Sequence, residues 1–148
     1  MSAAARAAAD PGAEAALAAV PAMEAMLACV AAAAPFAGAF RFLDLGAGSG
    51  RMAARLLAEF GDARGTLLET SAALTDAARA RLGADAARAE FSAEDYAHAE
   101  LPRGFEVVTS LFGLHSVGDI ERRALYREVY AALVPDGAAC TSATNCRG

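Results

Sequence analysis

The strongest constraint on the fold is the stretch Phe40–Gly50. An apolar run ends in Asp44, three glycines follow at alternate positions (Gly46, Gly48 and Gly50), and a helical pattern begins directly afterwards. Glycine lets the backbone adopt a positive φ and leaves no Cβ in the way of a ligand. A helix N-terminus offers unpaired N–H groups to a negatively charged group. The stretch therefore predicts a strand, a tight ligand-binding loop and a helix; a turn without a ligand is the alternative.

The spacing of these glycines distinguishes two classes of nucleoside ligand. A dinucleotide site has the pattern G-x-G-x-x-G, whose third glycine lets the helix pack closely on the strand. Counted from Gly46, that third glycine falls on Arg51. The acid followed by alternating glycines instead resembles the nucleoside-binding loop of the class I S-adenosylmethionine-dependent methyltransferases. The resemblance implies a set of cofactor-binding residues in this loop: Asp44, Gly46, Ala47, Gly48 and Gly50.

A second strand is predicted over residues 65–69, and it ends in the acid Glu69. Glu69 follows Gly50 at the distance that one crossover helix needs. A carboxylate at this end of a strand can accept two hydrogen bonds from the ribose hydroxyls of either NAD or S-adenosylmethionine. We therefore expect Glu69 and the adjoining Thr70 in the cofactor site, with a solvated loop acid as the alternative for Glu69. Thr70 and Ser71 also offer a cap to the next helix.

The following segment predicts a helix, a weak third strand and an acidic turn. Gly83 ends the helix, and apolar residues at helical spacing form its buried face: Leu74, Ala77, Ala78 and Leu82. A short strand is expected near residues 88–91. In the resembled family, an acid after the third strand accepts a hydrogen bond from the adenine amino group. The resemblance therefore implies that Glu94 or Asp95 contacts adenine, with an exposed acidic turn as the alternative.

The stretch from Phe105 to His115 is similar to the fourth strand of the same family. The family usually has aspartate where this chain has Glu106. The resemblance implies that Ser110 lies beside the transferred methyl group. A general base is needed only if the methyl acceptor arrives protonated, and His115 is the one candidate, because the resting pKa of histidine suits the task. A structural or exposed histidine is the alternative, so no catalytic residue is assigned.

The C-terminal part of the chain both supports and limits the resemblance. Residues 126–137 resemble the family's helix and Pro-Gly-Gly turn before a fifth strand, with Asp136 in place of one glycine. Residues 138–144 predict a poor strand, because they include no large apolar side chain. Class I methyltransferases continue through a further helix and an antiparallel pair of strands. We therefore expect a truncated relative that lacks the C-terminal strands of the family.

The N-terminal part predicts an extension and one helix. Residues 1–20 are expected to be a frayed or helical extension, and residues 21–148 to form the methyltransferase-like, S-adenosylmethionine-binding domain. Pro21 suits the first turn of a helix, and Pro35 ends it. Apolar residues recur at i, i+3, i+4 and i+7, which predicts that one face of this helix is buried: Met23, Met26, Leu27 and Val30.

Composition limits the classes of partner. The 148 residues suffice for one domain, and alanine supplies much of the 56% hydrophobic content. The formal net charge of −5 and the lack of a basic block argue against a domain that wraps nucleic acid. Cys29, Cys140 and Cys146 are poorly spaced for zinc, so we expect reduced thiols, a cytoplasmic protein and no metal site. No bulky apolar stretch is long enough to span a bilayer.

Alternating strands and helices predict an α/β fold with a doubly wound, mostly parallel sheet. The resemblance implies three layers, α/β/α, and the strand order 3-2-1-4-5. The predicted cofactor residues then meet at the carboxyl ends of the strands, at the point where the strand order reverses.

Three functions remain open. The first is S-adenosylmethionine-dependent methyl transfer to a small-molecule acceptor by in-line displacement from the sulfonium. The second is a non-catalytic, methyltransferase-like fragment that binds the cofactor or a partner chain; its fifth strand would be an unprotected edge, open to pairing with another chain or with a second copy. The third is a fragment of an NAD-dependent oxidoreductase, which Arg51 at the third glycine position disfavours.

Overall fold

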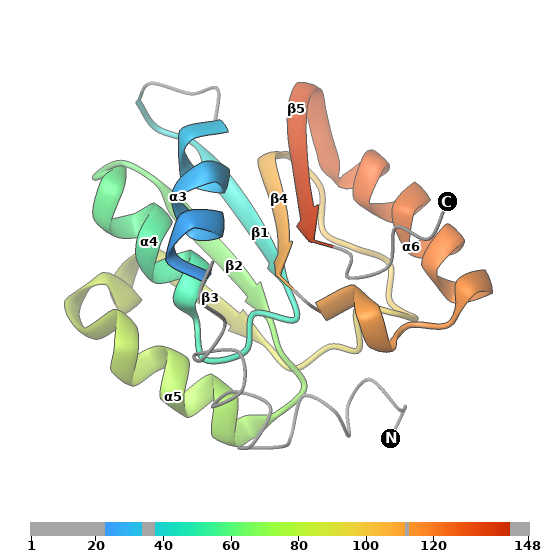
Figure 1. Cartoon of the computed structure of the whole chain (residues 1–148), viewed down its shortest axis with the longest axis horizontal. Helices are drawn as coiled ribbons and strands as arrows, with labels where there is room; N and C mark the ends of the chain where they lie inside the picture. Colours follow the sequence, from blue (N-terminus) through green and yellow to red (C-terminus); the bar gives the residue numbers. More distant parts are fainter. Residues whose placement is uncertain (1–22, 34–37, 112, 143–148) are drawn as a thin grey trace.

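The chain has an α/β architecture in which helices and strands alternate (Figure 1). The structure is a computed structural model, and it describes residues 23–33, 38–111 and 113–142. The helices are α3 (Met23–Ala33), α4 (Arg51–Glu59), α5 (Ala72–Leu82) and α6 (Asp119–Ala132), and the 3-10 helices are η1 (Gly83–Arg88) and η2 (Gly113–Ser116). The strands are β1 (Arg41–Leu45), β2 (Arg64–Leu68), β3 (Ala89–Ser92), β4 (Phe105–Leu111) and β5 (Leu133–Ser142). The expected extension over residues 1–20 lies outside the described residues.

The five strands form one parallel sheet in the order β3-β2-β1-β4-β5. This confirms the predicted doubly wound topology and its strand order. At the centre, Asp44 of β1 is in register with Leu67 of β2 and with Thr109 of β4. The chain moves from β1 through β2 to β3 and then returns to β4 on the other side of β1. The strand order therefore reverses between β1 and β4, and ligands of doubly wound folds bind at the carboxyl ends of such strands.

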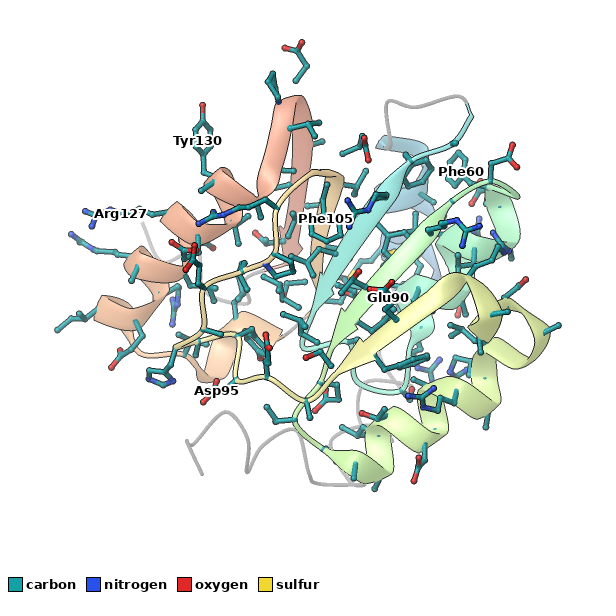
Figure 2. The ribbon with its side chains drawn as sticks, turned by 180° about the vertical axis from the view of Figure 1, so that it is seen from behind. Phe60, Glu90, Asp95, Phe105, Arg127 and Tyr130 are labelled. Carbon is teal, nitrogen blue, oxygen red and sulfur yellow. The ribbon has the colours of Figure 1, made fainter. Side chains whose placement is uncertain are left out.

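Two apolar clusters, one on each face of the sheet, confirm the three layers. On the first face, α3, α4 and α5 pack against Phe42, Leu67 and Val107. On the second face, Leu125 and Val129 of α6 pack against β1 and β4. Within the described ranges α6 is the one α-helix on this second face, because residues 93–104 connect β3 to β4 without a helix. The outer side of α6 carries the exposed Tyr130 (Figure 2).

Helix α5 has the predicted ends but buries a narrower face than expected. Ser71 caps its N-terminus, because the Ser71 Oγ accepts a hydrogen bond of 3.3 Å from the Leu74 N–H. Gly83 ends the helix with a φ of 55°. Ala78 is buried, whereas Ala77, which was predicted to be buried, is exposed. The difference arises because α5 contacts the rest of the protein through a narrow stripe, in which Ala78 and Leu82 are the buried residues.

Strand β5 (Leu133–Ser142) is more regular than its small side chains predict. It begins directly after α6, and its residues 138–142 pair with residues 107–111 of β4. An irregularity in the pairing precedes this run, and the predicted turn falls on it. Asp136 has a φ of 67° there, the one positive φ of a non-glycine residue within the described ranges. Backbone hydrogen bonds to β4 thus form a strand that side-chain propensity does not favour.

Arg88, the last residue of η1, holds the end of α4 in place. Its guanidinium donates hydrogen bonds of 2.7 to 3.2 Å to four main-chain carbonyls, those of Leu57, Phe60, Gly61 and Ala63. It also forms an ion pair of 2.8 Å with Asp85. Carbonyl groups at the end of a helix have no partner within the helix, so one cation satisfies several of them at once.

We predict that Arg88→Ala lowers the free energy of unfolding by about 2 kcal/mol, because hydrogen bonds to a charged donor are lost and the carbonyls stay partly buried. Arg55→Ala is the matched control: Arg55 forms an exposed pair of 2.9 Å with Glu59, and its loss should cost below about 0.5 kcal/mol. Urea unfolding measures both variants. Equal losses in the two variants would contradict the role of Arg88.

Candidate functional site

The glycine loop lies between β1 and α4, at the carboxyl edge of the sheet (Figure 1). Gly46, Gly48 and Gly50 have φ values of 65°, 55° and 75°. The left-handed region costs other residues about 1–2 kcal/mol each, so the alternating glycines match the backbone that the loop adopts. The prediction of strand, tight loop and helix N-terminus is confirmed.

Two close approaches explain why bulkier residues do not fit around this loop. A Cβ atom on Gly46 would lie 2.8 Å from the Tyr96 Oη and 2.9 Å from the Gly113 Cα. A Cβ atom on Gly113 would lie 2.6 Å from the Leu45 carbonyl oxygen. The Tyr96 hydroxyl donates a hydrogen bond of 2.9 Å to the Gly113 carbonyl. The segments that follow β1, β3 and β4 therefore meet in direct contact at this edge.

Glu69 fixes the shape of the loop from the neighbouring strand. Its side chain is 4% exposed. The Gly48 N–H donates to Oε2 and the Ser71 N–H donates to Oε1, each at 2.9 Å. A carboxylate oxygen can accept more than one hydrogen bond, so Glu69 retains capacity for further donors. Thr70, which is half-buried, lies between Glu69 and the first turn of α5.

Asp44 is a second buried carboxyl group beneath the loop. Its side chain is 2% exposed, and its Oδ1 accepts a hydrogen bond of 2.9 Å from the Thr109 hydroxyl. Burial raises the pKa of Asp44 from 3.8 to about 7; the hydrogen bond from Thr109 lowers it, and the charge of Glu69 raises it further. The carboxyl group therefore changes its protonation state near neutral pH.

Ser110 and Ala47 take different places near the loop. Ser110 is fully buried, and its hydroxyl donates a hydrogen bond of 2.8 Å to the Leu45 carbonyl, so it joins β4 to β1. Ala47 is half-buried in the loop, and its N–H donates to the Leu68 carbonyl at 3.2 Å. The structure thus brings the loop, Asp44 and Glu69 together and places Ser110 behind them.

The two acids after β3 differ in their surroundings. Glu94 is exposed, and its carboxylate has no partner among the described residues. Asp95 is half-buried and lies where the strands end (Figure 2). Its Oδ1 accepts a hydrogen bond of 3.1 Å from the Ala97 N–H, and its Oδ2 pairs with the His98 Nδ1 at 3.1 Å. Asp95 therefore shapes the turn, and Glu94 has the freer carboxylate.

His115, the candidate general base, lies in η2 directly after β4, so its backbone is at the same edge. The sequence pattern did not identify Tyr96, Thr109 or Gly113 as site residues. Tyr96 directly follows the predicted acid pair and Gly113 lies in the stretch similar to the fourth strand. Their roles depend on contacts between segments far apart in the chain, which residue spacing does not show.

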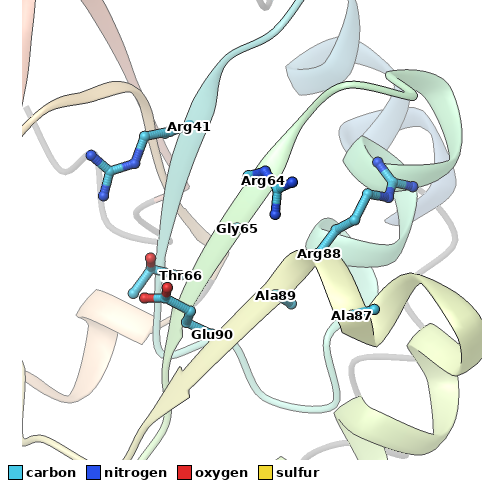
Figure 3. A pocket seen from close by; sticks show the side chains of 8 residues that line it. All are labelled: Arg41, Arg64, Gly65, Thr66, Ala87, Arg88, Ala89 and Glu90. Atoms are coloured by element: carbon cyan, nitrogen blue, oxygen red, sulfur yellow. The ribbon is translucent and has the colours of Figure 1, made fainter.

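A pocket also lies away from the glycine loop. The pocket is at the amino ends of β1–β3, where Arg41, Thr66 and Glu90 project from three neighbouring strands (Figure 3). None of the predicted site residues lines it.

In the described part of the chain, no group of three or more His, Cys, Asp or Glu side chains could hold a metal ion. The same residues include no helix that is both long and apolar enough to cross a membrane.

Comparison with protein families gives one match. Residues 42–137 match the model of a family described as a methyltransferase domain. A comparison with curated proteins finds no match. The matched range begins in β1 and ends in β5, and it includes the glycine loop, Glu69, Asp95 and Ser110.

Many solved structures share the fold. A methyltransferase from Thiobacillus denitrificans, in complex with S-adenosylhomocysteine, is 25% identical with a TM-score of 0.68, over 79% of this chain and 47% of that protein. The mitomycin 7-O-methyltransferase MmcR is 28% identical with a TM-score of 0.72, over 95% and 42%. DhpI, as a complex with SAH, is 25% identical with a TM-score of 0.70, over 93% and 65%. The chain thus spans about half the length of the first of these proteins.

We predict that Asp44 makes stability depend on pH. Its pKa is raised from 3.8 to about 7 in the folded chain, so the folded state holds the proton more tightly than the unfolded state. The stabilising effect is complete below about pH 4 and is lost as the pH rises to about 7, by an amount on the order of 4 kcal/mol. Asp44→Asn should remove this dependence.

Urea unfolding of the wild type and of Asp44→Asn at pH 5 and pH 8 measures the effect, because other titrating groups cancel in the difference. The variant should become more stable relative to the wild type as the pH rises. Parallel changes in the two proteins would show that Asp44 does not titrate in this range.

Proposed function

Because the chain belongs to the methyltransferase-domain family, we propose that it binds S-adenosylmethionine at the carboxyl edge of the sheet and serves methyl transfer to a small-molecule acceptor. The observation that carries the proposal is the Gly46–Gly50 loop, whose three positive-φ glycines follow Asp44 and are held by the Glu69 carboxylate. The T. denitrificans protein and DhpI were both crystallised with the demethylated product of this cofactor, which supports the same ligand here.

The residues at this edge fit the cofactor. The Gly46–Gly50 loop presents backbone without Cβ atoms at three positions, so a ligand can approach closely. Glu69 can accept further hydrogen bonds from ribose hydroxyls, and Glu94 or Asp95 can accept one from the adenine amino group. Asp44, Ala47, Thr70 and Ser110 complete the proposed site, with Ser110 acting through the strands that it joins. Two carboxyl groups beneath the loop favour a ligand with a positive centre.

When it is bound, the cofactor supplies a methyl group on a positively charged sulfur. The lone pair of the acceptor forms the new bond to the methyl carbon, the electrons of the carbon–sulfur bond remain on sulfur, and a protonated acceptor loses its proton. The chain therefore has to orient the acceptor in line and exclude water. We propose His115 as the general base only for an acceptor that arrives protonated.

Composition and one relative favour a small acceptor. The net charge of −5 and the lack of a basic block do not suit a large nucleic acid surface. MmcR is by name a mitomycin O-methyltransferase, a small-molecule enzyme, and it is 28% identical to this chain. A cytoplasmic location is part of the proposal; it is consistent with Cys29 and Cys140, which are free thiols.

A specific observation favours a second candidate function, a non-catalytic domain that binds the cofactor or a partner chain. Within the described residues, strand β5 is at the end of the sheet and pairs with β4 alone. A strand edge of this kind can pair with another chain or with a second copy. The NAD-dependent oxidoreductase gains no such support, because Arg51 occupies the third glycine position and the matched family is a methyltransferase domain.

Calorimetric titration with S-adenosylhomocysteine tests the proposal, with NAD as the control ligand. We expect saturable binding in the micromolar range and none with NAD. Gly48→Arg should weaken binding at least tenfold, because it places a side chain in a loop that needs a positive φ of 55°. Gly61→Arg is the matched control, since a Cβ atom there meets nothing within 4 Å.

A chain that is folded by circular dichroism and binds neither ligand would contradict the proposal. Equal binding by Gly48→Arg and the wild type would place the ligand elsewhere. A chain that binds S-adenosylhomocysteine but transfers no labelled methyl group to a panel of small phenols, amines and thiols would favour the non-catalytic function.

A further inference from the structure

A groove lies between α6 and the segment that connects β3 to β4; we call it the α6 groove. Residues 96–100 of the connecting segment line one side of it, and residues between 120 and 128 of α6 line the other. Its volume is about 520 Å³, which falls in the range of roughly 300–1,000 Å³ that is typical of small-molecule sites. The groove is therefore large enough for a small organic ligand.

The groove is lined by apolar side chains, most of them small. Ala97 and Ala99 lie on the connecting segment, and Ala124 lies on α6. The connecting segment has no helix that would fill the space beside α6. Leu125 is buried and also lines the groove, so it forms part of its floor. A ligand here would lie against an apolar surface.

Ile120 places a large apolar side chain at the mouth of the groove. It lines the groove and is nevertheless 83% exposed. Tyr130 is 82% exposed, but it projects from the outer side of α6 and is not among the lining residues (Figure 2). An exposed apolar side chain beside a concave apolar surface gains from contact with an apolar ligand. Ile120 has such a surface beside it.

The ionised side chains that line the groove are acidic, and they come from both of its sides: Glu100, Glu121 and Glu128. Arg103, which is outside the lining, forms ion pairs of 3.1 Å with Glu128 and 3.5 Å with Glu100, so it offsets one of these charges. His98 also lines the groove, and it pairs with Asp95 at 3.1 Å, so that pair adds no net positive charge. The groove therefore favours a cation over an anion.

We propose that the α6 groove binds a small organic cation that joins an apolar body to a protonated amine. The apolar body lies against Leu125 and Ile120, and the ammonium group lies toward Glu121. Because ion pairs near the surface are weak, the apolar body supplies most of the affinity and the charge supplies the selectivity.

The α6 groove is distinct from the proposed cofactor site. Tyr96 lines the groove, and its hydroxyl donates a hydrogen bond of 2.9 Å to the Gly113 carbonyl at the edge that carries the glycine loop. Tyr96 is buried, so it lies between the groove and the loop. The inference goes beyond the proposed function and does not depend on it.

Three probes that share one apolar body test the proposal: phenylbutylamine, phenylbutanol and phenylbutyrate. An NMR titration of the ¹⁵N-labelled chain should show saturable shifts at residues 96–100 and 120–125. The amine should bind about two- to fivefold more tightly than the alcohol, as expected for a pair near the surface, and the carboxylate should bind most weakly. Added salt should reduce the advantage of the amine.

Two variants of α6 test the apolar contact. Ile120→Ser should weaken binding of the amine and of the alcohol by about three- to tenfold, because both lose the same apolar contact. Tyr130→Ser is the matched control: it removes an equally exposed side chain of the same helix and should leave both affinities unchanged.

Two further variants test the charge. Glu121→Gln should reduce the preference for the amine over the alcohol and leave the affinity for the alcohol unchanged. Glu90→Gln is the control for net charge, since Glu90 is an exposed acid that lines the pocket at the amino ends of the strands. It should leave the preference unchanged.

The outcomes separate this proposal from the proposed function. Tighter binding of the carboxylate than of the amine, shifts centred outside the groove, or unchanged affinities in Ile120→Ser would overturn the α6 groove as a cation site. A wild type that binds S-adenosylhomocysteine but no amine would overturn the groove alone. A wild type that binds the amine in the groove but no S-adenosylhomocysteine would support the groove and contradict the proposed cofactor site.

Discussion

The structure of the site depends on the Glu69 carboxylate, which accepts the N–H groups of Gly48 and Ser71 at 2.9 Å each. One donor belongs to the loop after β1 and the other to the start of α5 after β2. Because the side chain is 4% exposed, its charge is stable only with such donors. They hold the loop in its left-handed turns, and Tyr96 and Gly113 then close the space around Gly46. The hydrogen bonds of Glu69 and the contact of Tyr96 with Gly113 together join the segments after four strands at one edge.

Local sequence signals predicted the part of this arrangement that depends on neighbours in the chain. The alternating glycines, the acid at the end of β2 and the Ser71 cap are all short-range features, and the strand order followed from the family resemblance. Contacts across the sheet were not predicted. Tyr96, Thr109 and Gly113 reach the site through tertiary packing, and Ser110 is buried because its hydroxyl donates to the Leu45 carbonyl. β5 forms a regular strand although its small side chains have a low strand propensity, because β4 supplies its backbone hydrogen-bond partners.

The helices cover the two faces of the sheet unevenly. Helices α3, α4 and α5 pack on one face, and within the described residues α6 packs alone on the other. Arg41, Thr66 and Glu90 are polar where no helix covers them, at the amino ends of the strands. The proposed cofactor site lies at the opposite, carboxyl edge, where Asp44, Glu69 and the loop meet.

The central claim is that the nucleoside ligand binds at the carboxyl edge and nowhere else. An NMR titration of the ¹⁵N-labelled chain with S-adenosylhomocysteine tests it most directly, because each backbone amide reports its own surroundings. We expect the large shifts at Gly46–Gly50, Glu69–Ser71 and Glu94–Tyr96, and none at Arg41, Arg64 or Arg88 at the opposite end. Shifts centred on those arginines, or spread evenly over a folded chain, would contradict the account.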